Sequence, residues 1–268
     1  MLNMRRIFLK SAVALSIALT ALPALAQETF RVGAYPANPP WQNRQEDGSF
    51  VGFEVDIVNE IAKRLDMTPE ISGYDFRALF VATASGRVDA VISSLTITDE
   101  RLEGQSFTQP YVEGALGIGV KSGSDIKSLE DLEGIRIGTI ATSFPETWMK
   151  EREAEIGYSS LSSYDSVANM LTDLLAGRVD AVVNDAVGLR YAFTQMQGLE
   201  LSYEITTGEL FAMMMSKDSA LLEDVNNTIS DMKSDGTMAA LYEKWLGAPP
   251  ADGSVTVTPL PIPTVGNY

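Results

Sequence analysis

A phrase that occurs twice constrains the fold of this chain more than any other feature. Residues 86–101 read GRVDAVISSLTITDER, and the first half recurs as GRVDAVVNDAV at residues 177–187. Each copy begins with a Gly-Arg helix stop, and a β-branched apolar run too short for a helix follows. This pattern is typical of a buried parallel strand. Because ligands bind at the C-terminal ends of such strands, the repeat predicts an α/β fold with a site at both strand ends.

The two copies end in side chains of opposite charge. The first copy carries hydroxyl groups at Ser93, Ser94 and Thr96. It ends with the cation Arg101, whereas the second copy ends with the anion Asp185. A zwitterion held between the copies would meet both charges, which indicates a two-lobed binding protein. The alternative is that the repeat is a common strand phrase with solvated surface charges.

Residues 1–26 are typical of a cleaved export signal. A basic start at Arg5, Arg6 and Lys10 precedes an apolar run, and residues 24–26 (Ala-Leu-Ala) suit cleavage. The apolar run is short for a membrane span. The phrase RRIFLK resembles a twin-arginine signal without its usual preceding Ser or Thr, so the export route stays open. We expect a periplasmic protein without a lipid anchor, because no Cys is present.

The composition excludes several classes of site. The chain has no Cys and no His, so it lacks disulfides, thiolate chemistry and the usual zinc and copper ligands. We therefore expect no metal and no cofactor. Without the three basic residues of the signal, 17 Lys and Arg stand against 36 Asp and Glu, a net charge of −19. This balance argues against nucleic acid and anionic membrane surfaces as partners.

The rest of the chain alternates predicted strands and helices. Strand-forming segments are residues 29–35, 68–72, 135–139 and 206–216, and helices are predicted over 54–67, 74–84, 166–176, 187–196, 220–233 and 238–245. The run Met213–Met215 is expected in the core of a strand. Residues 249–268 are rich in Pro, Thr and Val without periodicity, which predicts a flexible C-terminal tail.

A proline-rich loop follows the first predicted strand. Pro36, Pro39 and Pro40 force an irregular backbone there, because proline fixes φ and lacks an N–H donor. The loop presents Asn38, which we expect to face the site. It also presents Trp41, which either lines the site or pins the loop as a core residue.

Five phrases in order carry a family resemblance. They are PPWQ…DGSFVGFEVDIVNEIAKRL, GRVDAVISSLTITDER, FTQPYV, SLEDLEGIRIGT and DGTMAALYEKWLG. Together they resemble the family 3 extracellular solute-binding proteins, the polar amino-acid receptors of bacterial ABC importers. The resemblance covers the mature chain as far as Gly247.

The resemblance implies the type II periplasmic binding fold, which is α/β with two lobes. Each lobe would be a mixed sheet flanked by helices, joined by two hinge crossings near residues 111–117 and 208–212. Lobe 1 would comprise residues 27–114 and 209–248, and lobe 2 residues 115–208.

The resemblance also implies roles for individual residues. Those matching Ser93, Leu95, Thr96 and Arg101 hold the α-carboxylate of the ligand, and backbone around Ser94 supplements them. A guanidinium fork suits this task, because it matches a carboxylate bidentately. The residue matching Asp185 accepts the α-ammonium, and we expect it to stay ionised beside a cation.

A second-lobe loop is implied to contact the ligand. The Gly-Thr-Thr of the family reads Ala141-Thr142-Ser143 here, and the alanine either narrows the pocket or shifts the loop. Thr139 and Thr142 are candidate contacts, and Ser143 is another. Phe144 either covers the ligand or packs against a helix.

Selectivity for the ligand side chain is implied for positions matching Tyr35, Asn38, Phe76 and Gln109. Relatives that hold Lys, Arg or Gln often have Asp at the position of Tyr35, and many have a stacking aromatic residue at that of Asn38. No extra Arg or Lys suits an acidic side chain. These departures favour a neutral or polar amino acid, or a derivative of one.

The implied function is a monomeric periplasmic receptor, not an enzyme, that closes on an amino acid and delivers it to an ABC permease. One alternative is an enzyme on the same scaffold, such as a cyclohexadienyl or arogenate dehydratase. That activity needs a general acid or base beyond the ligand clamp. A detachable ligand-sensing receptor is the other alternative.

Overall fold

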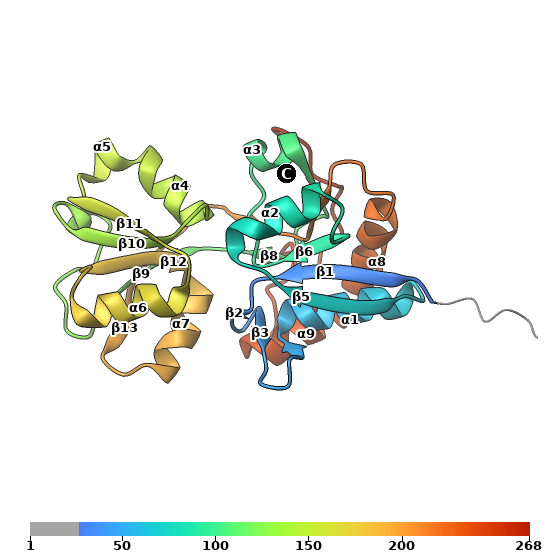
Figure 1. Ribbon diagram of the computed structural model, residues 1–268, viewed down its shortest axis with the longest axis horizontal. Helices are drawn as coiled ribbons and strands as arrows, with labels where there is room; N and C mark the ends of the chain where they lie inside the picture. The colour runs from blue at the N-terminus through green and yellow to red at the C-terminus, as the bar shows by residue number, and fades with distance from the viewer. Residues whose placement is uncertain (1–26) are drawn as a thin grey trace, which may run out of the picture.

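The computed structural model describes residues 27–268 and contains two α/β lobes (Figure 1). The signal predicted at residues 1–26 lies outside the described residues. The five strands of the first sheet run in the order β5-β1-β6-β15-β7, and those of the second in the order β11-β10-β12-β9-β13. Each sheet mixes parallel and antiparallel pairs. The predicted fold class is confirmed.

Lobe 1 is built around the first sheet. Its strands are β1 (Thr29–Ala34), β5 (Thr68–Gly73), β6 (Ala90–Ile92), β7 (Gln105–Phe107) and β15 (Met214–Ser216). Pro36 precedes β2 (Ala37–Asn38), and Pro39 and Pro40 lie between β2 and β3 (Gln42–Arg44). These two strands and β4 (Phe50–Val51) form a small antiparallel sheet. Met213, Met214 and Met215 are fully buried. Met214 and Met215 belong to β15 as predicted, whereas Met213 precedes the strand.

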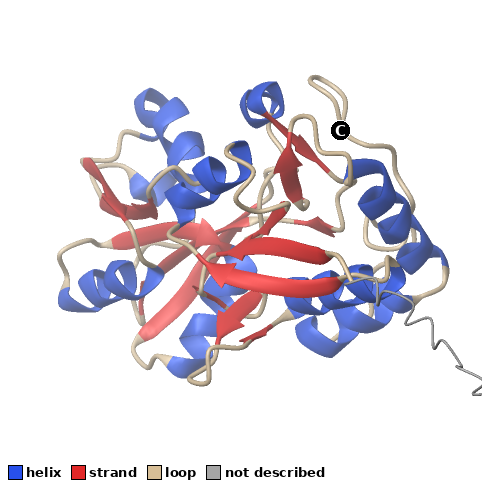
Figure 2. Cartoon of the chain, turned by 45° about the vertical axis from the view of Figure 1, so that its right-hand side comes forward, coloured by secondary structure: helices blue, strands red, loops and turns tan. Residues whose placement is uncertain are grey.

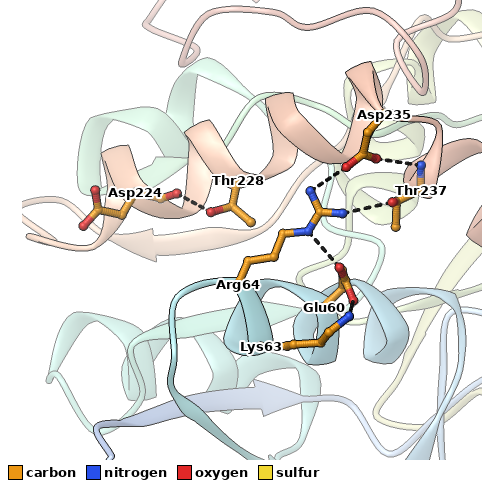
Figure 3. Close-up of polar contacts among 7 residues, drawn as sticks. All are labelled: Glu60, Lys63, Arg64, Asp224, Thr228, Asp235 and Thr237. Atoms are coloured by element: carbon orange, nitrogen blue, oxygen red, sulfur yellow. Dashed lines mark hydrogen bonds and ion pairs between the residues drawn. The ribbon is translucent and has the colours of Figure 1, made fainter.

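The helices of lobe 1 cover this sheet on both faces (Figure 2). They are α1 (Phe53–Arg64), α2 (Phe76–Ala84), α3 (Asp99–Gly104), α8 (Leu222–Ser234) and α9 (Thr237–Leu246). Arg64 joins three of them, as Figure 3 shows: it donates to Glu60 on α1 at 2.8 Å and to Thr237 on α9 at 2.9 Å. It also pairs with Asp235, between α8 and α9, at 2.8 Å.

Lobe 2 repeats the plan with its own sheet and helices. The strands are β9 (Leu116–Lys121), β10 (Arg136–Ile140), β11 (Ser160–Tyr164), β12 (Ala181–Asp185) and β13 (Leu199–Ile205). A 3₁₀ turn at Glu130–Leu132 precedes α4 (Phe144–Glu151), α5 (Glu153–Ile156), α6 (Val167–Ala176) and α7 (Ala186–Gln195). Among residues 27–268, no helix is long and apolar enough to cross a membrane.

The repeated phrase forms equivalent strands in the two sheets. β6 pairs in parallel with β1, and β12 pairs in parallel with β10. The aspartate of each copy binds an arginine on that neighbouring strand: Asp89 pairs with Arg31 at 2.5 Å, and Asp180 with Arg136 at 2.7 Å. The repeat therefore encodes the strand and its anchor to the next strand.

Two short strands carry the chain between the lobes. β8 (Val112–Glu113) pairs antiparallel with β14 (Leu210–Phe211). Both strands lie where the sequence predicts hinge crossings, and they are bonded to each other. A pair of hydrogen-bonded strands forms a hinge that can bend while the two lobes keep their internal packing.

The C-terminal segment differs from the predicted mobile tail, because residues 249–268 lie against lobe 1. Thr256 is buried and its hydroxyl donates to the carbonyl of Tyr111 at 2.9 Å. The Lys233 ammonium donates to Thr258 O at 3.0 Å, and Leu260 N donates to Gln109 at 2.9 Å. The contacts run from backbone to side chain, so they leave no periodic pattern in the sequence.

Candidate functional site

A pocket lies between the lobes, where β6 and β12 end. Most of the predicted site residues line it. They are Asn38, Phe76, Ser93, Ser94, Thr96, Arg101, Ser143, Phe144 and Asp185. Tyr35 lines it as well. The repeat therefore brings its two charged ends to one cavity.

The other predicted residues lie outside this lining. Trp41, Leu95 and Thr139 are fully buried. The side chain of Thr142 is exposed and turns back to donate to Ala141 O at 2.6 Å. The Gln109 amide donates to the Asn226 carbonyl at 2.9 Å and to Ser230 at 2.7 Å. The selectivity role expected for Gln109 therefore needs correction: its amide binds α8 and not the pocket.

Arg101 is fixed by the local fold of α3. Thr98 caps the helix by accepting from the Arg101 N–H at 3.2 Å, and the guanidinium donates to Thr96 O at 2.7 Å. It also donates to Thr142 O of lobe 2 at 3.4 Å and lies over the Phe80 ring at 5.2 Å from its centroid. Burial lowers the pKa of Arg101 to about 10, so the side chain remains a cation at neutral pH.

Asp185 ends β12 and caps α7. Its carboxylate accepts from the N–H groups of Gly188 at 2.7 Å and Val187 at 3.3 Å, so the positive end of the helix faces it. Trp41 of lobe 1 adds an indole N–H at 2.6 Å. Burial raises the pKa of Asp185, and these donors oppose that rise. These N–H donors favour the ionised form of Asp185.

The Ser93–Ser94 turn is held by buried groups of lobe 1. Ser94 has a φ of 43°, in the left-handed region that serine rarely adopts. Its N–H donates to both carboxylate oxygens of Glu54 at 2.9 and 3.1 Å, and Tyr111 donates to the same carboxylate. Burial raises the pKa of Glu54 to about 7. Asn38 donates to the Ser94 hydroxyl at 3.0 Å.

The lobe 2 wall has a matching arrangement. Thr142 has a φ of 63°, and its N–H donates to Glu146 at 2.8 Å. Ser143 accepts from Glu146 N at 3.3 Å and so caps α4, which brings Phe144 to the pocket. Ala141 is buried outside the lining, so its extra methyl group, compared with the family glycine, does not form part of the wall.

Glu209 is a pocket residue that sequence reasoning missed. It lies just before β14, is 5% exposed, and accepts from the Thr96 hydroxyl at 2.8 Å. Burial, reinforced by the charge of Asp185, raises the pKa of Glu209 to about 7. No motif marks it, because its place depends on the path of the hinge. The lining also includes Leu116, Ile140, Pro145, Val167, Asn184 and Phe211.

The arrangement can bind a zwitterion but offers no metal site. A cation from lobe 1 and an anion from lobe 2 face the same cavity, with aromatic side chains and hydroxyl groups around them. Among residues 27–268, no group of three or more acidic side chains is placed to hold a metal ion.

The family model and similar curated proteins point to the same protein family. Residues 30–248 match the model of the bacterial extracellular solute-binding proteins, family 3. The L-cystine-binding protein TcyJ of Escherichia coli (strain K12) is 31% identical over 228 residues, covering 82% of this chain and 83% of TcyJ. The histidine-binding periplasmic protein of the same strain is 29% identical, covering 88% of this chain and 94% of that protein.

The solved structures agree with the sequence relatives. An ancestral arginine-binding protein bound to arginine is 37% identical, with a TM-score of 0.78. The match covers 82% of this chain and 99% of that chain. The described fold, the pocket between the lobes and the family match over most of the chain lead to one conclusion. This chain belongs to the bacterial extracellular solute-binding proteins of family 3.

Proposed function

We propose that this protein captures an amino acid between its lobes in the periplasm and delivers it to the permease of an ABC importer. The observation that carries the proposal is the pair of opposite charges on opposite lobes. Arg101 would bind the α-carboxylate through its planar fork, and Asp185 would accept the α-ammonium. The named relatives bind amino acids, which supports this class of ligand.

Binding and closure are coupled in this mechanism. A ligand that touches both lobes has a higher affinity for the closed conformation than for the open one, and that difference drives closure. Two side-chain hydrogen bonds cross between the lobes within residues 27–268: Trp41 donates to Asp185, and Arg101 donates to the carbonyl of Thr142. The permease would then recognise the outer faces of the closed lobes.

The ligand we propose is a neutral or polar amino acid, or a derivative of one. Tyr35, Phe76 and Phe144 give the pocket aromatic walls, and Asn38 adds an amide. The side chain would lie among these groups. We further propose that the protein acts as a monomer and that residues 1–26 direct its export.

Thermal unfolding against the twenty amino acids tests the proposal. The mature chain is refolded to remove bound ligand, because any ligand specific to the native state raises Tm by mass action. We expect a shift with one or a few amino acids that is lost in Arg101→Ala and in Asp185→Ala. A micromolar ligand corresponds to about 8 kcal/mol of binding free energy.

Matched variants separate the site from general charge effects. Arg136→Ala and Asp180→Ala remove an exposed pair of the same residue types in lobe 2, so they should keep the ligand-induced shift. No shift with any of the twenty amino acids would contradict the proposal.

A dehydratase is the second candidate, because Glu209 places a carboxyl group with a pKa of about 7 in the pocket. Such a group can act as a general acid. Incubation with prephenate or arogenate tests this activity. We expect no aromatic product, and formation of one would favour the enzyme.

A further inference from the structure

Glu209 is a buried ionisable residue in the pocket that has no part in the ligand contacts proposed for Arg101 and Asp185. Glu209 lies at the hinge, where its backbone carbonyl accepts a hydrogen bond from the Gly114 N–H at 2.8 Å. Its Oε2 atom accepts from Thr96, whereas its Oε1 atom has no hydrogen-bond partner among residues 27–268. An unpaired buried oxygen is costly, so a site that retains one is suited to a donor that arrives with a ligand.

The hydroxyl group of Thr96 links Glu209 to the pocket. A hydroxyl has one proton, and Thr96 donates it to Glu209. Its remaining capacity is therefore as an acceptor, so this hydroxyl cannot also donate to the α-carboxylate, the role that the family resemblance implies for it. Thr96 lines the pocket, so its lone pairs are available to an N–H⁺ group there. Glu209 thus determines which way this hydroxyl is polarised.

The charged groups around Glu209 come from several elements. Asp185, where β12 meets α7, opposes ionisation of Glu209, whereas Arg101 on α3 favours it. Glu54 on α1 accepts from the single N–H of Ser94 and from the Tyr111 hydroxyl, and the charge of Asp185 raises its pKa further. Glu113, on the paired strand β8, is exposed. The pocket therefore presents two carboxylates and one guanidinium.

We propose that Glu209 is a positioning residue that orients the Thr96 hydroxyl toward the ligand ammonium and shares the charge of that ammonium with Asp185, releasing a proton as the ligand binds. The inference rests on the proposed amino-acid receptor function. In this arrangement the α-carboxylate of the ligand neutralises the charge of Arg101. The α-ammonium of the ligand then lies among Asp185, Thr96 and Glu209.

The sign of the pH dependence follows from the electrostatics. In the free protein the pKa of Glu209 is raised to about 7, so part of the population is protonated at neutral pH. A bound ammonium favours the carboxylate and lowers that pKa. Binding therefore releases a proton, and affinity increases as pH rises toward 8.

Affinity measured from pH 5.5 to 8 tests the proposal. The probe is whichever of the twenty amino acids gives the largest thermal shift, with histidine left out because its side chain titrates. We expect the Kd of the unmodified protein to fall about tenfold or more over this range. Glu209→Gln keeps an acceptor for the Thr96 hydroxyl. Its Kd at pH 8 should be higher than that of the unmodified protein, and it should be nearly independent of pH.

A further variant serves as a control. Glu113→Gln makes the same charge change on the exposed face of the hinge and should keep the pH dependence. A purely structural role of Glu209 would weaken binding equally at every pH and leave the slope unchanged.

Calorimetry covers the case in which Glu209→Gln does not fold. Titration of the unmodified protein at pH 7, in two buffers of different ionisation enthalpy, should show release of about half a proton per ligand. No release, or a pH slope that persists in Glu209→Gln, would overturn the inference alone. Failure of all twenty amino acids to bind would overturn the proposed function as well.

Discussion

At the scale of single residues, the site is held by two strained positions, one in each lobe. Ser94 and Thr142 both have left-handed backbone, which costs of order 1–3 kcal/mol for residues other than glycine. Each donates its N–H to a buried glutamate, Glu54 in lobe 1 and Glu146 in lobe 2. The same solution therefore holds a turn on each wall of the pocket between the lobes.

Trp41→Phe should weaken ligand binding about tenfold. The substitution keeps an aromatic ring beside Phe53 and Phe211, whose centroids lie at 5.9 and 5.5 Å from Trp41. It removes the N–H donated to Asp185 at 2.6 Å, a charge-assisted bond between the lobes. Because that bond favours the closed conformation, its loss should raise the Kd measured by calorimetry.

Trp245→Phe is the matched control for this bond. Trp245 donates its indole N–H to Asp56 at 2.7 Å, and both residues belong to lobe 1. This variant should lower stability slightly and leave the Kd unchanged. An equal loss of affinity in both variants would show that the Trp41 bond has no special role in closure.

At the scale of elements, the sequence allowed six of the nine helices in residues 27–268 to be predicted, because their patterns are local. The strands β9, β11 and β13 of lobe 2 were not predicted. The predicted helix over residues 166–176 corresponds to Val167–Ala176, with Ser166 as its cap. The repeat similarly marks β6 and β12. The position of Glu209 could not be predicted, since it depends on β14 pairing with β8 from a distant part of the chain.

The ordered packing of residues 249–268 could not be predicted from the sequence for a different reason. A segment without periodic apolar residues can still be ordered when its backbone finds partners, and here Lys233 and Gln109 supply them. The sequence shows that apolar residues do not recur periodically in this segment, but it does not show which groups will bond to its backbone.

Removal of residues 249–268 should therefore destabilise lobe 1. Lys233 would keep only its bond to Pro110 O at 2.7 Å, and the carbonyl of Tyr111 would lose the Thr256 hydroxyl. We expect a Tm lower by several degrees, and a loss of about 1 kcal/mol of unfolding free energy for Thr256→Val alone. An unchanged Tm after truncation would show that the segment contributes nothing to the fold.

At the scale of the whole molecule, the two lobes meet over a concentration of buried acidic groups. Glu54, Asp185 and Glu209 are all buried, and burial raises the pKa of each. The pKa values of Glu54 and Glu209 are about 7, compared with an ordinary value of 4.5. The energetic cost of burying these groups is therefore concentrated at the pocket between the lobes, where a cationic group would lower it.

The unfolding free energy of the ligand-free protein should consequently fall as pH rises from 4.5 to 7. The folded state binds more protons than the unfolded state in this window, because the folded pKa values of Glu54 and Glu209 are the higher ones. The stability they contribute is complete below pH 4.5 and is lost as pH passes through 7. Each group should account for roughly 1–3 kcal/mol of the change.

Urea unfolding at pH 5, 6 and 7 measures this slope. The net charge of the full chain, −16 at pH 7, also destabilises the folded state by self-repulsion at higher pH. Glu113→Gln corrects for that effect, since it removes one exposed charge. We expect a flatter slope in Glu54→Gln and in Glu209→Gln than in Glu113→Gln. Equal slopes in all three variants would show that Glu54 and Glu209 do not cause the pH-dependent loss of stability.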